Sequence, residues 1–259
     1  MLRSLVGSEM CIRDRAQSDR GRIELFYDFF GEDNIANTAE SRVLGPFVVG
    51  GQGNAETDAG VPTIAGMVSG AGRITTTNED NHTTLVGTNT AFSASLNGPI
   101  VLEARVQLDN IDTKEVFFGL SDIDPDTLSI ETDVMTGATT TLTLTASDLC
   151  GFFLSAELTD DEDWHMVYNG GSTTGETTST SVDADDDAVA AEWQVLRLEI
   201  DTNGTARWYI DGVLKQTKTG AVSTTTVMGV CLGVEAKGNA IENLDVDYLL
   251  VTANRDWTV

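Results

Sequence analysis

Three aspartates at alternate positions, Asp122, Asp124 and Asp126, have a spacing that could support chemistry. They follow directly on an apolar, strand-like segment, and Asp133 lies further along. Carboxylate oxygens at this density are the hard ligands that Ca²⁺ prefers. An EF-hand is not predicted, because Thr127 occupies the place of the glycine that makes that loop's sharp turn. The loop is therefore a candidate Ca²⁺ site, and the simpler alternative is an acidic loop surrounded by solvent.

Sugar binding would require exposed aromatic rings that stack on a pyranose, with polar groups nearby to fix its orientation. The candidate ligand-binding residues are Trp164, Tyr168, Trp193 and Tyr209. Tyr209 follows Trp208 in a predicted strand, where neighbouring side chains point to opposite faces, so one of the two rings should face outward. The alternative is that these rings lie in the core.

Other polar clusters give weaker signals. The acidic runs Asp160–Asp163 and Asp183–Asp187 are interpreted as solvated, because like charges repel one another. The two histidines are His82, in a polar loop, and His165, in a predicted strand. The sequence contains no Gly-x-Ser-x-Gly elbow. Nucleophilic catalysis is therefore not predicted.

The elements that must position these residues are strands. Val195–Lys218 shows the clearest pattern, with apolar side chains at alternate positions and turns at Asp201–Gly204 and Asp211–Gly212. This pattern predicts a three-stranded antiparallel meander. Further strands are predicted at Ile23–Phe30 (pairing with the last strand), Ile64–Ser69, Arg73–Thr77, Thr83–Gly87, Pro99–Leu108, Lys114–Ser121 (its hairpin partner), Thr139–Thr145, Cys150–Leu158, Trp164–Tyr168, Thr226–Val234 and Leu244–Thr252.

Short strands separated by turn signals predict an all-β, two-sheet antiparallel sandwich, with residues 170–191 as a solvated excursion. The motifs D-x-N-G, W-Y-I-D-G and V-x-K-x-T in the meander resemble the back half of concanavalin A-like (laminin-G-like) jelly-roll domains. The resemblance is most specific over Glu192–Arg255 and looser over Pro99–Leu158. The order of these features is also similar to modules of marine phage virion proteins. Domains of this kind often carry Ca²⁺ sites at loop rims.

The resemblance implies a test for hydrolase activity. Glycoside hydrolases of the jelly-roll class carry Glu-x-Asp-x-Glu, or a version one residue longer, on one strand, which places two carboxylates on the same face. Three carboxylate pairs are candidates for such a triplet, but none completes it: Glu199 and Asp201, Glu131 and Asp133, and Glu24 and Asp28. Asp245 and Asp247 share a face but form only Asp-x-Asp, with Leu249 next. The sequence therefore predicts that the chain is not an enzyme.

Composition limits the partners. The chain has 259 residues, of which 41% are hydrophobic, enough for a sizeable core. Its 15 Lys and Arg face 41 Asp and Glu, a formal charge of −26 that would repel nucleic acid backbones and anionic membranes. No apolar run is long enough to span a bilayer. The acidity suits divalent cations, a salty environment or simply solubility. Cys150 and Cys231 lie in apolar strands and are interpreted as buried thiols; the alternative is one disulfide if those strands are neighbours.

The N-terminal sequence LVGSEMCIRDR, Leu5–Arg15, resembles the conceptual translation of a sequencing-library adapter. The alternative is an ordinary basic arm. We expect residues 1–19 to be artefactual or disordered, and residues 20–259 to form a single jelly-roll domain. On this interpretation the natural N-terminus, with any signal peptide, is missing from the sequence.

These observations predict a non-enzymatic viral structural module, of the kind displayed on a phage capsid or tail surface. Its expected partners are other virion proteins, itself and surface glycans, with no nucleic acid and no membrane insertion. The alternative is a carbohydrate-binding domain of a secreted or cell-surface bacterial protein. A jelly-roll glycoside hydrolase is a more distant alternative.

Overall fold

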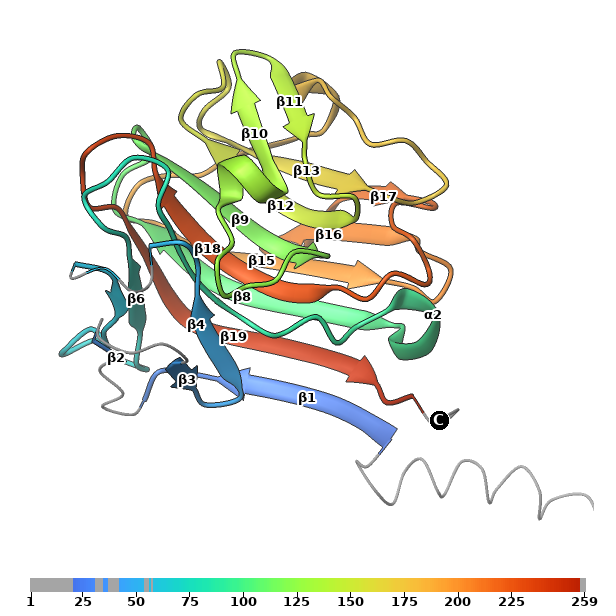
Figure 1. Cartoon of the computed structure of the whole chain (residues 1–259), viewed down its shortest axis with the longest axis horizontal. Helices are drawn as coiled ribbons and strands as arrows, with labels where there is room; N and C mark the ends of the chain where they lie inside the picture. The colour runs from blue at the N-terminus through green and yellow to red at the C-terminus, as the bar shows by residue number, and fades with distance from the viewer. Residues whose placement is uncertain (1–20, 31–34, 37–41, 54–55, 57, 257–259) are drawn as a thin grey trace, which may run out of the picture.

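A computed structural model describes residues 21–30, 35–36, 42–53, 56 and 58–256, which form two antiparallel β-sheets packed against each other (Figure 1). The predicted two-sheet sandwich is therefore confirmed. The predicted N-terminal segment 1–19 lies outside the described residues.

The first sheet, called sheet A, has nine strands within the described residues. In spatial order they are β17 (Val213–Lys218), β16 (Ala206–Ile210), β15 (Trp193–Ile200), β8 (Ile100–Leu108), β19 (Asn243–Asn254), β6 (Gly72–Thr75), β5 (Gly60–Val61) and β2 (Ile35–Ala36), with β1 (Arg22–Tyr27) paired to β19. The predicted meander is confirmed as β15–β16–β17. The predicted pairing of the first strand with the last is also confirmed.

The second sheet, called sheet B, has eight strands in the same part of the chain. In spatial order they are β14 (Asp183–Asp187), β13 (Asp163–Asn169), β12 (Leu149–Ser155), β9 (Lys114–Ser121), β18 (Gly229–Ala236), β7 (Thr83–Gly87), β4 (Phe47–Gly50) and β3 (Arg42–Leu44). A separate hairpin consists of β10 (Met135–Ala138) and β11 (Thr141–Leu144), and the helical elements are α2 (Ala94–Asn97), η2 (Ile130–Val134) and η3 (Ser179–Ser181). None of the helices in the described part of the chain is long and apolar enough to cross a membrane.

The core lies between the two sheets. In β8, Ile100, Leu102 and every second residue after them are buried, and the residues between are half-buried, so one face of sheet A packs inward. Trp208 of β16 crosses the interior, and its indole N–H donates to the Gly151 carbonyl on β12 (2.8 Å). The Tyr168 ring lies 6.2 Å from the Trp208 ring, so aromatic side chains of both sheets fill the centre of the sandwich.

Sheet B is buried on both faces, unlike sheet A. All eight residues of β9 are buried, and so are all eight of β18. The Lys114 ammonium donates to the Asn243 carbonyl on sheet A (2.8 Å), so Lys114 and its alternate residues face the core. Glu115, Phe117 and the residues that alternate with them therefore face away from the core.

Residues 122–148, called the cover segment, lie over this second face of sheet B. The segment includes η2, which contacts β9 and β18, and the hairpin β10–β11 (Figure 1). Its apolar side chains Leu128, Ile130 and Val134 are at most 1% exposed. The backbone of Pro125 comes so close to Gly50 on β4 that a Cβ there would collide with the Pro125 carbonyl. The cover segment therefore seals the outer side of sheet B.

Several predictions of local structure are wrong. Lys114–Ser121 is not the hairpin partner of Pro99–Leu108, because β9 pairs with β12 and β18 in the opposite sheet. The strand predicted at Thr139–Thr145 is shorter, because the chain turns after β10, and β11 spans Thr141–Leu144. Ile64–Ser69 forms no strand, and the excursion 170–191 contains η3 and the edge strand β14.

A bulge in β19 also changes the predicted face of the last strand. Leu244 and Val246 are both buried, but the pairing of β19 with β8 shifts between Val246 and Tyr248. Beyond the shift Leu249 and Val251 are the buried residues. Tyr248, which simple alternation would place on the same face as Leu244 and Val246, instead lies half-buried on the outer side of sheet A.

Candidate functional sites

The outer face of sheet A carries aromatic side chains that are partly exposed. Trp193 and Tyr209, both predicted as ligand-binding residues, are half-buried there, and so is Tyr248. Their neighbour Phe26 on β1 is 49% exposed and lies 6.3 Å from the Tyr248 ring. Because Trp208 is buried and Tyr209 is not, the prediction that one of these two rings faces outward is confirmed.

Arginine–carboxylate pairs lie among these rings. The Arg197 guanidinium bridges Glu103 (3.0 Å) and Glu199 (2.6 Å) across β8 and β15. Arg105 contacts the Trp193 ring, 4.8 Å from its centre, and pairs with Asp247 (2.7 Å). Further pairs join Arg73 to Asp245 and Arg207 to Asp201.

Two tyrosine hydroxyls complete this network. The Tyr248 hydroxyl donates to Glu103 (2.9 Å) and the Tyr209 hydroxyl to Glu199 (3.4 Å). Burial, and then the neighbouring carboxylates, raise the pKa of both phenols, so both stay neutral hydrogen-bond donors. The face thus combines ring surfaces with fixed donors and acceptors, the two requirements for holding a sugar.

Trp164 and Tyr168 do not belong to this face. Both lie on the core side of β13, with exposures of 0% and 1%, and the Trp164 indole N–H donates to Gln194 (2.9 Å). The expectation of exposed rings is therefore wrong for these two residues. The physical reason is that β13 lies inside sheet B, next to the edge strand β14, and directs its alternate aromatic side chains between the sheets.

The predicted Ca²⁺ loop shows local hydrogen bonding. Asp124 accepts the Asp126 amide (3.0 Å), which closes a short turn around Pro125. Asp122 accepts the Asp148 amide (3.3 Å) at the base of the cover segment. The carboxylates of Asp122, Asp124 and Asp126 do not converge into a common group in the described structure. Calcium binding by this loop stays a prediction that its geometry does not support.

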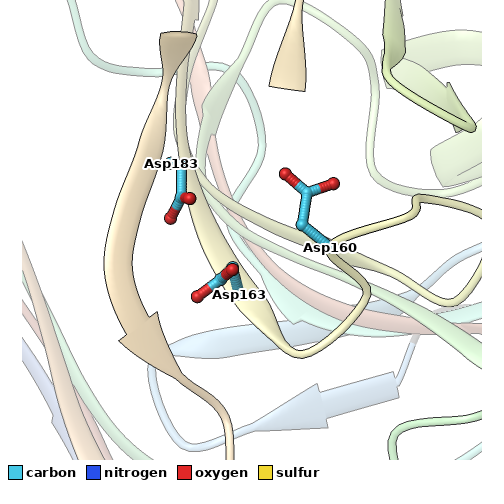
Figure 2. Close-up of side chains that lie close together, drawn as sticks. All are labelled: Asp160, Asp163 and Asp183. Carbon is cyan, nitrogen blue, oxygen red and sulfur yellow. The ribbon is translucent and has the colours of Figure 1, made fainter. Parts of the chain in front are cut away.

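A different set of carboxylates does converge. Figure 2 shows Asp160 in the turn before β13, Asp163 at the start of β13 and Asp183 at the start of β14, with ligand atoms that all lie within 4.8 Å of one another. The pairing of β13 with β14 brings the two acidic runs together, placing Asp183 opposite His165. The buried His165 ring contacts Asp160 through Nε2 (3.2 Å).

The electrostatics of this group fit a hard cation. Burial, followed by repulsion from Asp183, raises the pKa of Asp163 to about 7. Three half-buried carboxylates therefore share a small space in which their negative charge is incompletely balanced, and oxygen donors of this kind suit Ca²⁺ and similar ions. The three aspartates could hold such an ion by one oxygen each.

A second carboxylate group lies under the cover segment. Glu115 on β9 and Glu235 on β18 stand opposite each other in the strand register, and both residues are 0% exposed. Burial raises the pKa of Glu115 to about 8 and raises that of Glu235 as well. Both side chains face away from the core, but the cover segment separates them from solvent, so a dissolved ligand cannot reach them in this structure.

Sequence reasoning missed both carboxylate groups. Each is assembled from segments far apart in the chain, and only the order of strands in sheet B brings the members together. A signal was present in Lys114–Ser121 and Gly229–Ala236, where one glutamate lies next to a run of mostly apolar residues in a strand. The cysteine interpretation agrees with the structure, in which Cys150 and Cys231 are buried free thiols.

Comparisons with known proteins relate the chain to others by fold. No protein-family model matches the sequence, and no curated protein matches it. A solved protein of unknown function from Shewanella oneidensis MR-1 aligns with 100% of this chain and 98% of its own, at 12% identity and a TM-score of 0.59. LamAcat from Zobellia galactanivorans aligns over 88% of this chain and 96% of its own (10% identity, TM-score 0.53). The Emp47p carbohydrate recognition domain aligns over 86% and 96% (10% identity, TM-score 0.52). At these identities the likeness establishes the concanavalin-like sandwich fold alone.

Proposed function

We propose that this chain is a non-enzymatic recognition module that contacts glycans through the outer face of sheet A. The observation that carries the proposal is the gathering of Trp193, Tyr209 and Tyr248, all partly exposed, on one face. Each ring lies beside an arginine or carboxylate whose position is fixed by an ion pair or hydrogen bond. Such a surface supplies stacking for a pyranose and polar partners for its hydroxyls.

The absence of enzyme activity is part of this proposal. The sequence contains no Glu-x-Asp-x-Glu motif and no version one residue longer. Glu115 and Glu235, which stand opposite each other on adjacent strands of sheet B, are sealed beneath the cover segment. A glycosidase must bring both carboxylates to the scissile bond of a bound sugar. The sealed pair therefore supports a binding role over a hydrolytic one.

The charge of the protein supports the choice of glycan over other partners. A formal charge of −26 disfavours nucleic acids and anionic lipid surfaces. On the outer face of sheet A the arginines are matched by carboxylates, which leaves an array of paired charges. Hydroxyl groups of a neutral sugar can donate to the carboxylates and accept from the guanidinium groups without a net charge of their own.

The proposal also includes where the module is displayed. The similarity in the order of sequence features to phage virion modules supports display on the surface of a virus particle, where other virion proteins or further copies would be its neighbours. The rival location is the surface of a bacterium. Mass spectrometry of purified particles from the source environment tests this: peptides of this chain in the particles support the virion, and peptides only in bacterial envelope fractions support the rival.

Glycan binding is tested by a glycan array followed by titration calorimetry on the best ligand. Trp193→Ala and Tyr209→Ala should each weaken binding by about tenfold or more, equivalent to ~1.4 kcal/mol. Leu96→Ala, which removes an exposed apolar side chain from α2, is the matched control and should bind as the unchanged protein does. The proposal fails if no glycan binds at high micromolar concentration, or if binding survives both aromatic substitutions.

A further inference from the structure

Two carboxyl groups that no solvent reaches face each other beneath the cover segment. Glu115 and Glu235 lie on adjacent strands of sheet B at the same level, and both are 0% exposed. Two ionised carboxylates opposite each other on adjacent strands, in a site without water, are strongly unfavourable unless cations balance them. How each carboxyl is held therefore determines how the site responds to pH.

Glu235 ties the cover segment to the sheet. Its carboxylate accepts the Ile130 amide (2.7 Å), the Glu131 amide (3.2 Å) and the Ser129 hydroxyl (3.0 Å), all three from the cover segment. The Thr83 hydroxyl on β7 donates to it as well. The cover segment and sheet B thus share this one carboxyl group as an anchor.

Glu115 is less well satisfied. Its Oε1 accepts the Ser155 hydroxyl on β12 (2.7 Å), whereas its buried Oε2 has no hydrogen-bond partner among the described residues. An ionised carboxylate with a bare, buried oxygen is costly, and a proton on the group reduces that cost.

The surrounding charges do not balance the pair. The Lys237 ammonium at the end of β18 is the nearest cation, and it is shared with Glu131 of η2 (2.6 Å) and Glu157 beyond β12 (3.3 Å). The next titratable groups already have partners: Asp133 of η2 accepts the Ser129 amide, and His165 on the outward face of β13 contacts Asp160. One shared ammonium therefore serves three carboxyl groups, Glu115, Glu131 and Glu157.

We propose that residues 122–148 form a pH-dependent cover, held closed by a proton on the Glu115–Glu235 pair and loosened when that proton is lost. Once both groups are ionised, their repulsion is relieved only by hydration. The core of the sandwich lies on the opposite side of sheet B, so water reaches the pair from the side of the cover segment. Local opening of a surface segment also costs less than unfolding of the sheets.

The direction of the pH effect follows from the pKa of Glu115, which burial raises from its ordinary 4.5 to about 8. The closed state binds the proton more tightly than an open state in which Glu115 is hydrated. Closure is therefore favoured most at low pH, and the ratio of open to closed molecules rises as pH increases from about 4.5 to about 8, then levels off.

Hydrogen exchange resolved by peptide tests the proposal on the full chain at pH 5.5 and pH 8. Glu115→Gln keeps the shape of the side chain but cannot ionise. Comparing it with the unchanged protein at each pH cancels the intrinsic pH dependence of exchange. We expect peptides within 122–148 to exchange faster in the unchanged protein than in the variant, by a factor that grows at least about tenfold between pH 5.5 and pH 8. Glu192→Gln, an exposed substitution, should behave as the unchanged protein does.

Two results would overturn the proposal: equal exchange of 122–148 in the two proteins at pH 8, or a pH-dependent loss of protection that includes β8 to the same extent. If Glu115→Gln does not fold, the two thiols give a second readout. Cys231 lies on the face of sheet B beneath the cover segment, in register with Gly119, whereas Cys150 lies in register with Leu120 on the core face. Alkylation at pH 8 should modify Cys231 before Cys150. Equal labelling of both thiols, or none at Cys231, would contradict a cover that opens.

Discussion

The outer faces of the two sheets both carry glutamates opposite a residue on the neighbouring strand, but the surroundings of these glutamates differ. On sheet A, Glu103 stands opposite Arg197 on the neighbouring strand, in partial contact with solvent, and the two form an ion pair. On sheet B, Glu115 stands opposite Glu235 in a site that the cover segment seals. Ionised carboxylates on adjacent strands therefore destabilise the fold little where solvent and arginine are present, and strongly where both are absent. The difference separates a surface suited to binding from a buried site suited to structural control.

The largest expected effect comes from removing the anchor on sheet B. Glu235→Ala would leave the Ile130 and Glu131 amides and the Ser129 hydroxyl without their buried acceptor. Each unsatisfied buried donor costs about 1–3 kcal/mol, so we expect a loss of at least ~3 kcal/mol in the free energy of unfolding. Urea denaturation at pH 6 measures this loss.

The matched substitution on sheet A is Glu199→Ala, which removes a partly exposed partner of Arg197 and Tyr209. Exposed ion pairs contribute about 0–1 kcal/mol, so its loss should stay below ~1 kcal/mol. Similar losses for the two variants would show that the sealed and open faces do not differ energetically as the structure indicates.

The next effect concerns the aspartate group at the edge of sheet B. The pKa of Asp163 is raised from its ordinary 3.8 to about 7, so the folded state binds this proton more tightly than the unfolded state does. The stability that the protonated group contributes is therefore lost as pH rises from about 4 to 7. A cation that binds the ionised form should restore that stability. We expect Ca²⁺ to raise the melting temperature by a few degrees at pH 8, and less at pH 5.

Two aspartate substitutions locate the site of that Ca²⁺ effect. Asp163→Asn should abolish it, because it removes one of the three converging ligands. Asp124→Asn should leave it intact, because Asp124 lies in the loop whose carboxylates do not converge. The reverse result would restore the loop predicted from the sequence. An unchanged melting temperature in the unsubstituted protein would remove both sites.

Strand patterns predicted much of the fold because alternation is a local property. Ile100 to Leu108 alternates buried and half-buried residues as expected, and the meander of β15 to β17 follows from its turn residues. Sheet membership was harder. The sequence order of β8 and β9 suggests a hairpin, whereas each strand pairs in a different sheet. Register also failed at one point, since the bulge after Val246 moved Tyr248 to the outer face.

The sites were predicted less well than the fold, for a related reason. Tyr209 was found because alternation along a single strand places it on the face opposite Trp208, whereas Trp193 was named only as an available aromatic residue. Trp164 shows the same alternation, but its strand lies between two others and directs the ring inward. The convergence of Asp160 with Asp183 depends on the pairing of β13 with β14, which no local pattern encodes.

The smallest expected effect lies within the outer face of sheet A. Arg105 contacts the Trp193 ring, 4.8 Å from its centre, and also pairs with Asp247. The arginine is therefore held either by the ring or by the carboxylate. A double-mutant cycle of Arg105→Ala and Trp193→Ala should give a coupling of ~0.5–1 kcal/mol in the free energy of unfolding, as partly exposed cation–π pairs do.

Repeating the cycle with Asp247→Ala in place of Trp193→Ala separates the two contacts of Arg105. High salt should reduce the Arg105–Asp247 coupling, which is an interaction of two partly exposed charges. If instead the Arg105–Trp193 coupling is absent, the arginine is held by Asp247 alone, and the ring of Trp193 is free to turn when a sugar binds.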